Sequence, residues 1–140
     1  MALRKFRFRA WDSLRNAMDY DFTTTETNGD KYFVDIQNGE LTVGDIDEHN
    51  DYYELVLMQF TGLPDKKGVE IWESDIVKIP EHYDGDMLIP EVFCEVMFED
   101  GMFCAKGNGQ YDWYSIDEVQ IDNYEIEVVG NIYETPNILS

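Results

Sequence analysis

The chain has 140 residues, of which 44% are hydrophobic, and its formal net charge at pH 7 is −20. This length predicts a single domain over residues 1–140, large enough to fold without disulfides or metals. No apolar run exceeds four residues and the start of the chain is charged, which exclude a transmembrane helix and a signal peptide, so we expect a cytoplasmic protein with no membrane contact. Such a negative charge repels nucleic-acid phosphates and argues against ordinary binding to DNA or RNA.

Positive charge is concentrated at the start of the chain. Five of the ten basic residues lie within positions 1–15, and the remainder carries five basic and 29 acidic residues. Residues 5–11 alternate, which predicts a strand with apolar residues on one face and basic residues on the other. The basic side chains there define a candidate partner surface: Arg4, Lys5, Arg7 and Arg9. We favour a role in neutralising the acidic remainder or protecting a sheet edge over the docking of an anionic partner.

Residues 20–50 form an acidic region with two hairpin signals, Asn28-Gly29 and Asn38-Gly39. A turn centred on Asn38-Gly39 pairs Ile36 with Leu41 and Val34 with Val43. These four apolar side chains then share one face, so the hairpin needs something to cover it.

Residues 55–79 form the central stretch. Apolar residues at 55–58 and 60 occupy both faces of a strand, which predicts that this strand lies inside the fold. Gly62, Pro64, Asp65 and Gly68 indicate a chain reversal, and short strands follow over residues 69–72 and 75–77.

The last third of the chain predicts a long loop, a tight hairpin, a short helix and a final strand. Residues 80–91 are bounded by prolines, which is typical of a loop. Ser115 is the expected cap of a short helix with Glu118 at its third position. The final strand is expected over 124–133, and residues 138–139 are expected to pack back on the fold.

The Asp100-Gly101 turn fixes the register of the hairpin and the faces of the two cysteines. A primed two-residue turn there pairs Phe98 with Phe103 and Val96 with Ala105. Cys94 and Cys104 then lie on opposite faces, so we expect both to be reduced and structural. Across the chain, eight residues should be largely buried: Leu55, Leu57, Ile71, Val77, Val96, Phe98, Ile126 and Val128.

These elements predict a mainly β fold. Short strands closed by tight turns favour a small SH3-like barrel at about 55–133, with additional antiparallel strands in the acidic hairpin region at about 20–50 and at most one or two short helices. The barrel name is an analogy to common β topologies and implies no function.

Three blocks of the sequence resemble the YopX family of phage and prophage proteins. They are Lys5–Asp12, then Met58–Leu63 with Asp65, Gly68, Glu70–Glu73 and Asp75–Val77, and finally Val128–Glu134 followed by Pro136. The chain departs from the family at Ser74, where glycine is usual, at the extra residue Phe8, and over residues 20–50. The resemblance implies a mainly β, phage-borne protein in a bacterial cytoplasm. It transfers no catalytic residue, because the family has no established activity.

No residue pattern indicates catalysis or a cofactor. His49 and His82 lie in polar connections without an obvious nucleophile nearby. Glu81, Asp84 and Asp86 could offer oxygen ligands with His82, but the spacing of a calcium-binding EF-hand is absent. We therefore assign no catalytic, cofactor-binding or metal residue.

Three functions remain open. The leading hypothesis is a non-enzymatic module that binds an unidentified protein partner or assembles with itself, through the 20–45 hairpin or the N-terminal strand. An alternative is an acidic mimic of nucleic acid that inhibits a host DNA-binding enzyme, which requires carboxylates spaced like phosphates. The third is a metal-dependent hydrolase that uses the 81–86 loop.

Overall fold

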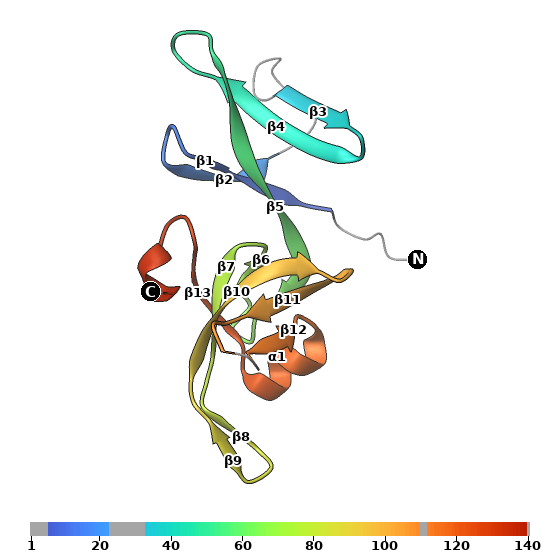
Figure 1. Ribbon diagram of the computed structural model, residues 1–140, viewed down its shortest axis with the longest axis vertical. Helices are drawn as coiled ribbons and strands as arrows, with labels where there is room; N and C mark the ends of the chain where they lie inside the picture. Colours follow the sequence, from blue (N-terminus) through green and yellow to red (C-terminus); the bar gives the residue numbers. More distant parts are fainter. Residues whose placement is uncertain (1–5, 23–32, 110–111, 140) are drawn as a thin grey trace. The chain divides into compact units, whose positions relative to one another are not determined.

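The structure is a computed structural model of the chain that describes residues 6–22, 33–109 and 112–139 (Figure 1). The described residues are mainly β with antiparallel pairing, one α-helix and one short 3-10 helix, which confirms the predicted fold class at this level. The chain divides into two compact units, Met1–Gln59 and Phe60–Ser140. None of the described helices is long and apolar enough to cross a membrane.

Unit 1 contains an antiparallel sheet whose strands lie in the order β2-β1-β5-β4-β3. The bounds are β1 Phe8–Asp12, β2 Ala17–Phe22, β3 Phe33–Gln37, β4 Glu40–Ile46 and β5 Tyr52–Pro64, the last of which continues into unit 2. Its small core consists of Ala10, Val43 and Leu55, packed against Phe8, Tyr53 and Leu57. The Asn28-Gly29 turn lies outside the described residues.

The β3–β4 hairpin has the predicted register. Val34 pairs with Val43 and Ile36 pairs with Leu41 across the Asn38-Gly39 turn. Both turn residues have positive φ, 53° at Asn38 and 81° at Gly39, as a type I′ turn requires. Only Val43 of the four apolar residues is buried, so most of the face that was expected to be covered is open to solvent.

Unit 2 contains a five-stranded antiparallel sheet in the order β12-β11-β10-β7-β13. Its strands are β7 Asp75–Ile79, β10 Val92–Glu99, β11 Met102–Lys106, β12 Trp113–Ser115 and β13 Glu127–Asn131, while β6 Glu70–Trp72 pairs with the end of β5. The order has two free ends among the described strands, so this sheet is open. The predicted SH3-like barrel is not confirmed.

The β10–β11 hairpin has the predicted register, with Phe98 opposite Phe103 and Val96 opposite Ala105. Cys94 and Cys104 are free, fully buried and on opposite faces, as predicted. Burial raises the pKa of the Cys94 thiol to about 12, so at neutral pH it is not a thiolate nucleophile.

Five of the eight residues predicted to be buried are buried, namely Leu55, Ile71, Val77, Val96 and Ile126. Leu57 and Val128 are half-buried. The prediction is wrong for Phe98, which is 55% exposed. β7 pairs with β10 only at Val92–Glu95, so Phe98 lies beyond that cover and packs edge-to-face on Phe103, with ring centroids 5.0 Å apart.

Residues 80–91 do not form the predicted loop. They contain a small hairpin, β8 His82–Asp84 and β9 Met87–Ile89, which extends from the unit 2 sheet (Figure 1). Gly85 takes a positive φ of 61° in the turn between them. The bounding prolines led to the loop prediction, although Gly85-Asp86 also suits a two-residue hairpin turn.

The helix and the final strand are both shifted from their predicted positions. Helix α1 spans Glu118–Tyr124, and its N-cap is Asp117, whose carboxylate accepts a hydrogen bond from the Gln120 amide. Ser115 belongs to β12 instead and pairs with Cys104. Because the helix takes up residues to 124, β13 is shorter than the strand predicted over 124–133. The 3-10 helix η1, Pro136–Leu139, ends the described chain with residues 138–139 half-buried.

Ser74 lies in the left-handed region of backbone conformation, with φ of 70°. It is the third residue of the turn that joins β6 to β7, a position where a type II turn favours glycine. Its amide donates to the Val96 carbonyl at 2.8 Å, and its carbonyl accepts from the Ile132 amide at 3.0 Å. These two hydrogen bonds hold the turn in place, so residue 74 has to keep its positive φ. Glycine adopts this conformation without strain, which explains why it suits this position.

We predict that Ser74→Gly stabilises unit 2 by about 0.5–1 kcal/mol, because glycine removes the steric cost of positive φ at a modest cost in chain entropy. Chemical denaturation followed by circular dichroism measures the change. The neighbouring variant Glu73→Gly is the control and should destabilise, since φ at Glu73 is not positive. Destabilisation by Ser74→Gly would contradict the interpretation.

Candidate functional site

The most exposed apolar surface of unit 1 is the β3–β4 hairpin, residues 33–46, which we call the outer hairpin. All five residues of β3 are exposed, and β3 is the last of the described strands in the sheet order. On one face Ile36 is 69% exposed, next to the more shielded Val34 and Leu41. This is a continuous apolar face on a terminal strand, the kind of surface at which proteins associate.

On the opposite face of the outer hairpin, Phe33 contacts an aromatic ring of the neighbouring strand β5. Phe33 and Tyr52 of β5 are both more than half exposed and meet edge-to-face with centroids 6.3 Å apart. Gly44 lies under the Tyr52 ring, since a Cβ there would approach the ring to 2.4 Å. The outer hairpin therefore presents apolar side chains on both faces.

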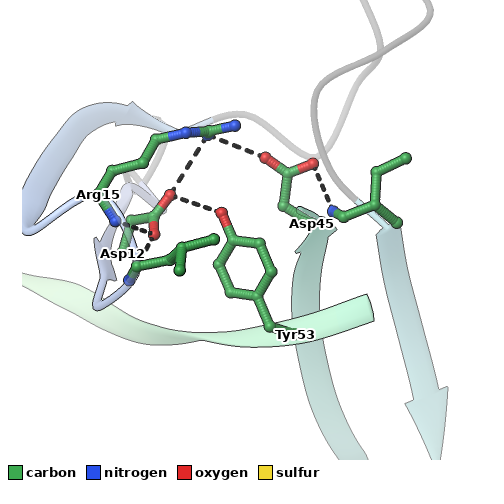
Figure 2. A network of polar contacts seen from close by, with 6 residues as sticks. Asp12, Arg15, Asp45 and Tyr53 are labelled. Atoms are coloured by element: carbon green, nitrogen blue, oxygen red, sulfur yellow. Dashed lines mark hydrogen bonds and ion pairs between the residues drawn. The ribbon is translucent and has the colours of Figure 1, made fainter. Parts of the chain in front are cut away.

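A polar network joins three segments of unit 1 (Figure 2). The Arg15 guanidinium donates to Asp12 at 3.3 Å and to Asp45 at 3.0 Å, and the Tyr53 hydroxyl donates to Asp12 at 3.0 Å. Asp12 also accepts hydrogen bonds from the backbone amides of Leu14 and Arg15, which close the turn between β1 and β2. The contact with Asp45 raises the pKa of Arg15.

This network is structural. A carboxylate offers about four acceptor sites, and Asp12 already receives four hydrogen bonds from Leu14, Arg15 and Tyr53. It has no lone pair left to act as a general base. A neighbouring hollow of about 550 Å³ is lined by Arg15 and His49 but also by the acids Asp47 and Glu48, which oppose an anionic ligand.

The structure describes two of the four residues of the predicted basic surface. Arg4 and Lys5 lie outside the described residues, and Arg7 is half-buried. Arg9 is 1% exposed, and its guanidinium carbon lies 5.6 Å from the centre of the Tyr20 ring. Because Arg9 is buried, the predicted basic outer face is wrong at this residue.

Unit 2 contains an aromatic pocket of about 390 Å³. The rings of His82, Tyr114 and Tyr124 contact one another edge-to-face, with centroids 4.8 to 6.1 Å apart. Trp113 lines it too and is 44% exposed. The remaining lining residues are Asp84, Ile89, Pro90, Gly109, Asp112 and Gln120. Sequence reasoning missed this pocket, because its rings come from β8, β12 and α1.

The 81–86 segment does not gather metal ligands. His82 turns its ring towards Tyr124, and its Nδ1 lies 2.9 Å from the Pro80 carbonyl oxygen. Within residues 6–22, 33–109 and 112–139, no group of three His, Cys, Asp or Glu side chains is arranged to hold a metal ion. The geometry gives no support to the metal-dependent hydrolase.

Asp65, in the central block of the sequence, has a structural role. One carboxylate oxygen accepts from the amides of Lys67 at 2.8 Å and Val69 at 2.9 Å, which shapes the reversal between β5 and β6. The other accepts from the amide of Val128 at 2.9 Å, on β13. This single side chain, 4% exposed, ties the beginning of unit 2 to its last strand.

The last block has a similar role. The Asn131 side chain accepts from the amides of Tyr133 and Glu134, and Thr135 bonds back to the Asn131 backbone. A Cβ on Gly130 would lie 1.9 Å from the Thr135 hydroxyl, so only glycine fits there. These residues build a turn after β13 and perform no chemistry.

Asp65, Gly130 and Asn131 lie within the part of the chain that matches a known protein family. The model of the YopX protein family matches residues 7–140. The chain belongs to the YopX family. No curated protein matches the sequence.

Two solved structures share the fold of this YopX-family chain. Protein EF1440 from Enterococcus faecalis is 23% identical with a TM-score of 0.57, over 97% of this chain and 99% of that one. YopX from Bacillus subtilis is 23% identical with a TM-score of 0.54, over 96% of this chain and 98% of that one. At this level of identity the similarity shows the fold alone.

We predict that Asp65→Asn destabilises the chain by about 2–3 kcal/mol, because an amide nitrogen would face a backbone donor and leave it unsatisfied. Urea denaturation followed by tryptophan fluorescence measures the loss. Asp47→Asn is a matched control, since Asp47 closes the same kind of loop, accepting from the amides of His49 and Asp51, and has no third bond to a distant strand. Equal effects of the two substitutions would contradict the role of Asp65.

We also predict an alkaline loss of stability through Tyr53. Burial, and then the hydrogen bond to Asp12, raise the pKa of Tyr53. Because the folded pKa lies above the unfolded value of about 10, the protonated phenol stabilises unit 1 at lower pH, and this contribution is lost as pH rises through the folded pKa. As pH rises from 8, the midpoint temperature of thermal unfolding should fall less steeply in Tyr53→Phe than in wild type. Tyr52→Phe, which leaves the network intact, should follow wild type; identical profiles for all three proteins would refute the assignment.

Proposed function

We propose that this chain is a non-enzymatic assembly module that associates with a second copy of itself through the outer hairpin and binds a further protein partner. The observation that carries the proposal is the outer hairpin, where β3 is exposed at every residue and apolar at three of its five positions. The phage-borne, cytoplasmic setting rests on the family resemblance.

The distribution of charge favours a second copy on this surface. Each chain carries a net charge of −20, which opposes association wherever acidic residues face one another. Asp35 is the only charged residue among the five residues of β3. Two negatively charged chains can therefore approach closely along this strand. Antiparallel pairing of β3 with β3 of the second copy sets the same patch against itself, as twofold symmetry requires.

The same geometry supports a role without catalysis. The carboxylate of Asp12 is saturated with donors, Cys94 is buried with a raised pKa, and the polar side chains of the family motifs hold backbone amides. What the described surface offers instead is apolar and aromatic area, which is typical of protein–protein contacts.

We predict that wild-type protein is a dimer or larger by size-exclusion chromatography with light scattering, and that Ile36→Asp is monomeric. An acidic residue at a 69% exposed position costs little in the monomer but places like charges in the contact. Val119→Asp is the matched control, because Val119 on α1 is 64% exposed and belongs to unit 2. It should associate as wild type does.

Salt distinguishes the apolar route from a charged one. Screening at about 0.5 M salt should strengthen an apolar contact between like-charged chains. It would weaken a contact between the basic N-terminal strand and acids of a neighbouring chain. A wild-type monomer at both low and high salt, or equal loss of association in both variants, would overturn the proposal.

A further inference from the structure

The aromatic pocket of unit 2 has the chemistry of a cation site. We propose that it binds the lysine or arginine side chain of a basic segment on a partner protein. This rests on the proposed function as a binding module and names the chemistry of its further partner.

The floor of the pocket is a cluster of aromatic rings. Tyr114 is only 7% exposed, and it packs against Tyr124 and His82. This low exposure means that the floor is poorly hydrated, and burial is also the main cause that raises the pKa of Tyr114. A cation over an aromatic face is held more strongly when water is excluded. Tyr124, which is half-buried, is the ring of this cluster that stays partly open to a ligand. The Trp113 side chain lies on the other face of β12, next to Cys104.

The polar groups of the pocket are mainly acceptors. A carbonyl can only accept, so the His82 Nδ1 atom donates to Pro80. Asp112 uses one carboxylate oxygen for the Gly109 amide, which leaves the other for a ligand. The Asp84 side chain makes no hydrogen bond or ion pair with the rest of the described chain.

Charge complementarity selects the ligand. The pocket has two carboxylates and no lysine or arginine among the described residues that line it, on a chain of net charge −20. A phosphate or carboxylate ligand would find no charged partner there. Ammonium and guanidinium groups have donors for the carboxylates and a charge for the rings.

The β8–β9 hairpin forms one wall of the pocket. The register places His82 opposite Ile89 and Asp84 opposite Met87, so these four residues share a face. His82, Asp84 and Ile89 line the pocket, and Met87 continues the same face while 66% exposed. A peptide whose basic side chain enters the pocket can therefore run along this hairpin.

Calorimetry with a short capped peptide of alternating glycine and arginine tests the proposal, at about 0.5 M salt to suppress non-specific attraction. Replacing arginine by its neutral isostere citrulline should abolish binding. Tyr124→Leu should weaken binding of the arginine peptide about tenfold, and Asp84→Asn about threefold.

Matched controls separate the pocket from the general acidity of the chain. Asp122→Asn removes one exposed acid from α1 outside the pocket, and Tyr83→Leu removes a 70% exposed ring from the other face of β8. Both should bind as wild type does. Equal binding of the citrulline peptide, equal weakening in pocket and control variants, or no binding to wild type would overturn the proposal.

Two further experiments identify what kind of molecule supplies the cation and which of the two proposals a negative result contradicts. Tighter binding of spermidine than of the peptide, with the same dependence on Tyr124 and Asp84, would overturn the assignment to a protein segment. Repeating the titration with Ile36→Asp separates the two proposals, because the pocket lies in unit 2 and its binding should survive loss of self-association. Association is scored by light scattering and the pocket by peptide affinity, so each can fail alone.

Discussion

A single buried carboxylate holds the first and last strands of unit 2 together. Asp65 accepts two backbone amides in the reversal after β5 and a third from Val128 on β13, more than sixty residues later in the chain. Buried backbone donors need partners, and a carboxylate satisfies three of them from one point. The salt bridge from Lys67 to Glu127, at 2.7 Å, lies over the same junction. The geometry of β13, and of the turn that follows it, depends on this arrangement.

The other family motifs serve the same purpose. Asp75 accepts from the Trp72 amide in the turn where Ser74 takes a positive φ, and Asn131 organises the turn after β13. The YopX signature therefore encodes a scaffold. The surfaces proposed for recognition, namely the outer hairpin and the aromatic pocket, lie outside the three blocks.

Sequence reasoning succeeded where a local pattern dictates geometry. Asn38-Gly39 and Asp100-Gly101 fix turn type and therefore register, so the pairings of Val34 with Val43 and of Phe98 with Phe103 could be predicted. It failed where tertiary context decides. Ser115 and Asp117 are both good helix caps, and the strand pairing of Ser115 with Cys104 leaves the cap to Asp117.

Contacts between distant segments left little trace in the sequence. The pocket rings at His82, Tyr114 and Tyr124, and the network of Asp12 with Tyr53, are brought together only by the tertiary fold. One local pattern in the sequence, an aspartate followed three residues later by asparagine or glycine, would have predicted two of the loops. Asp47–Asp51 and Asp65–Val69 form the same loop, in which the fourth residue, Asn50 or Gly68, has positive φ and the aspartate accepts amides two and four residues later.

Native-state hydrogen exchange of the Val69 and Val128 amides tests the role of Asp65 most directly. Val69 is 47% exposed, so its amide is protected only if the Asp65 carboxylate holds it. The account predicts that both amides exchange as slowly as that of Val77 in the core, through global unfolding of unit 2. Exchange as fast as at Gly85, in the exposed β8–β9 turn, would contradict it.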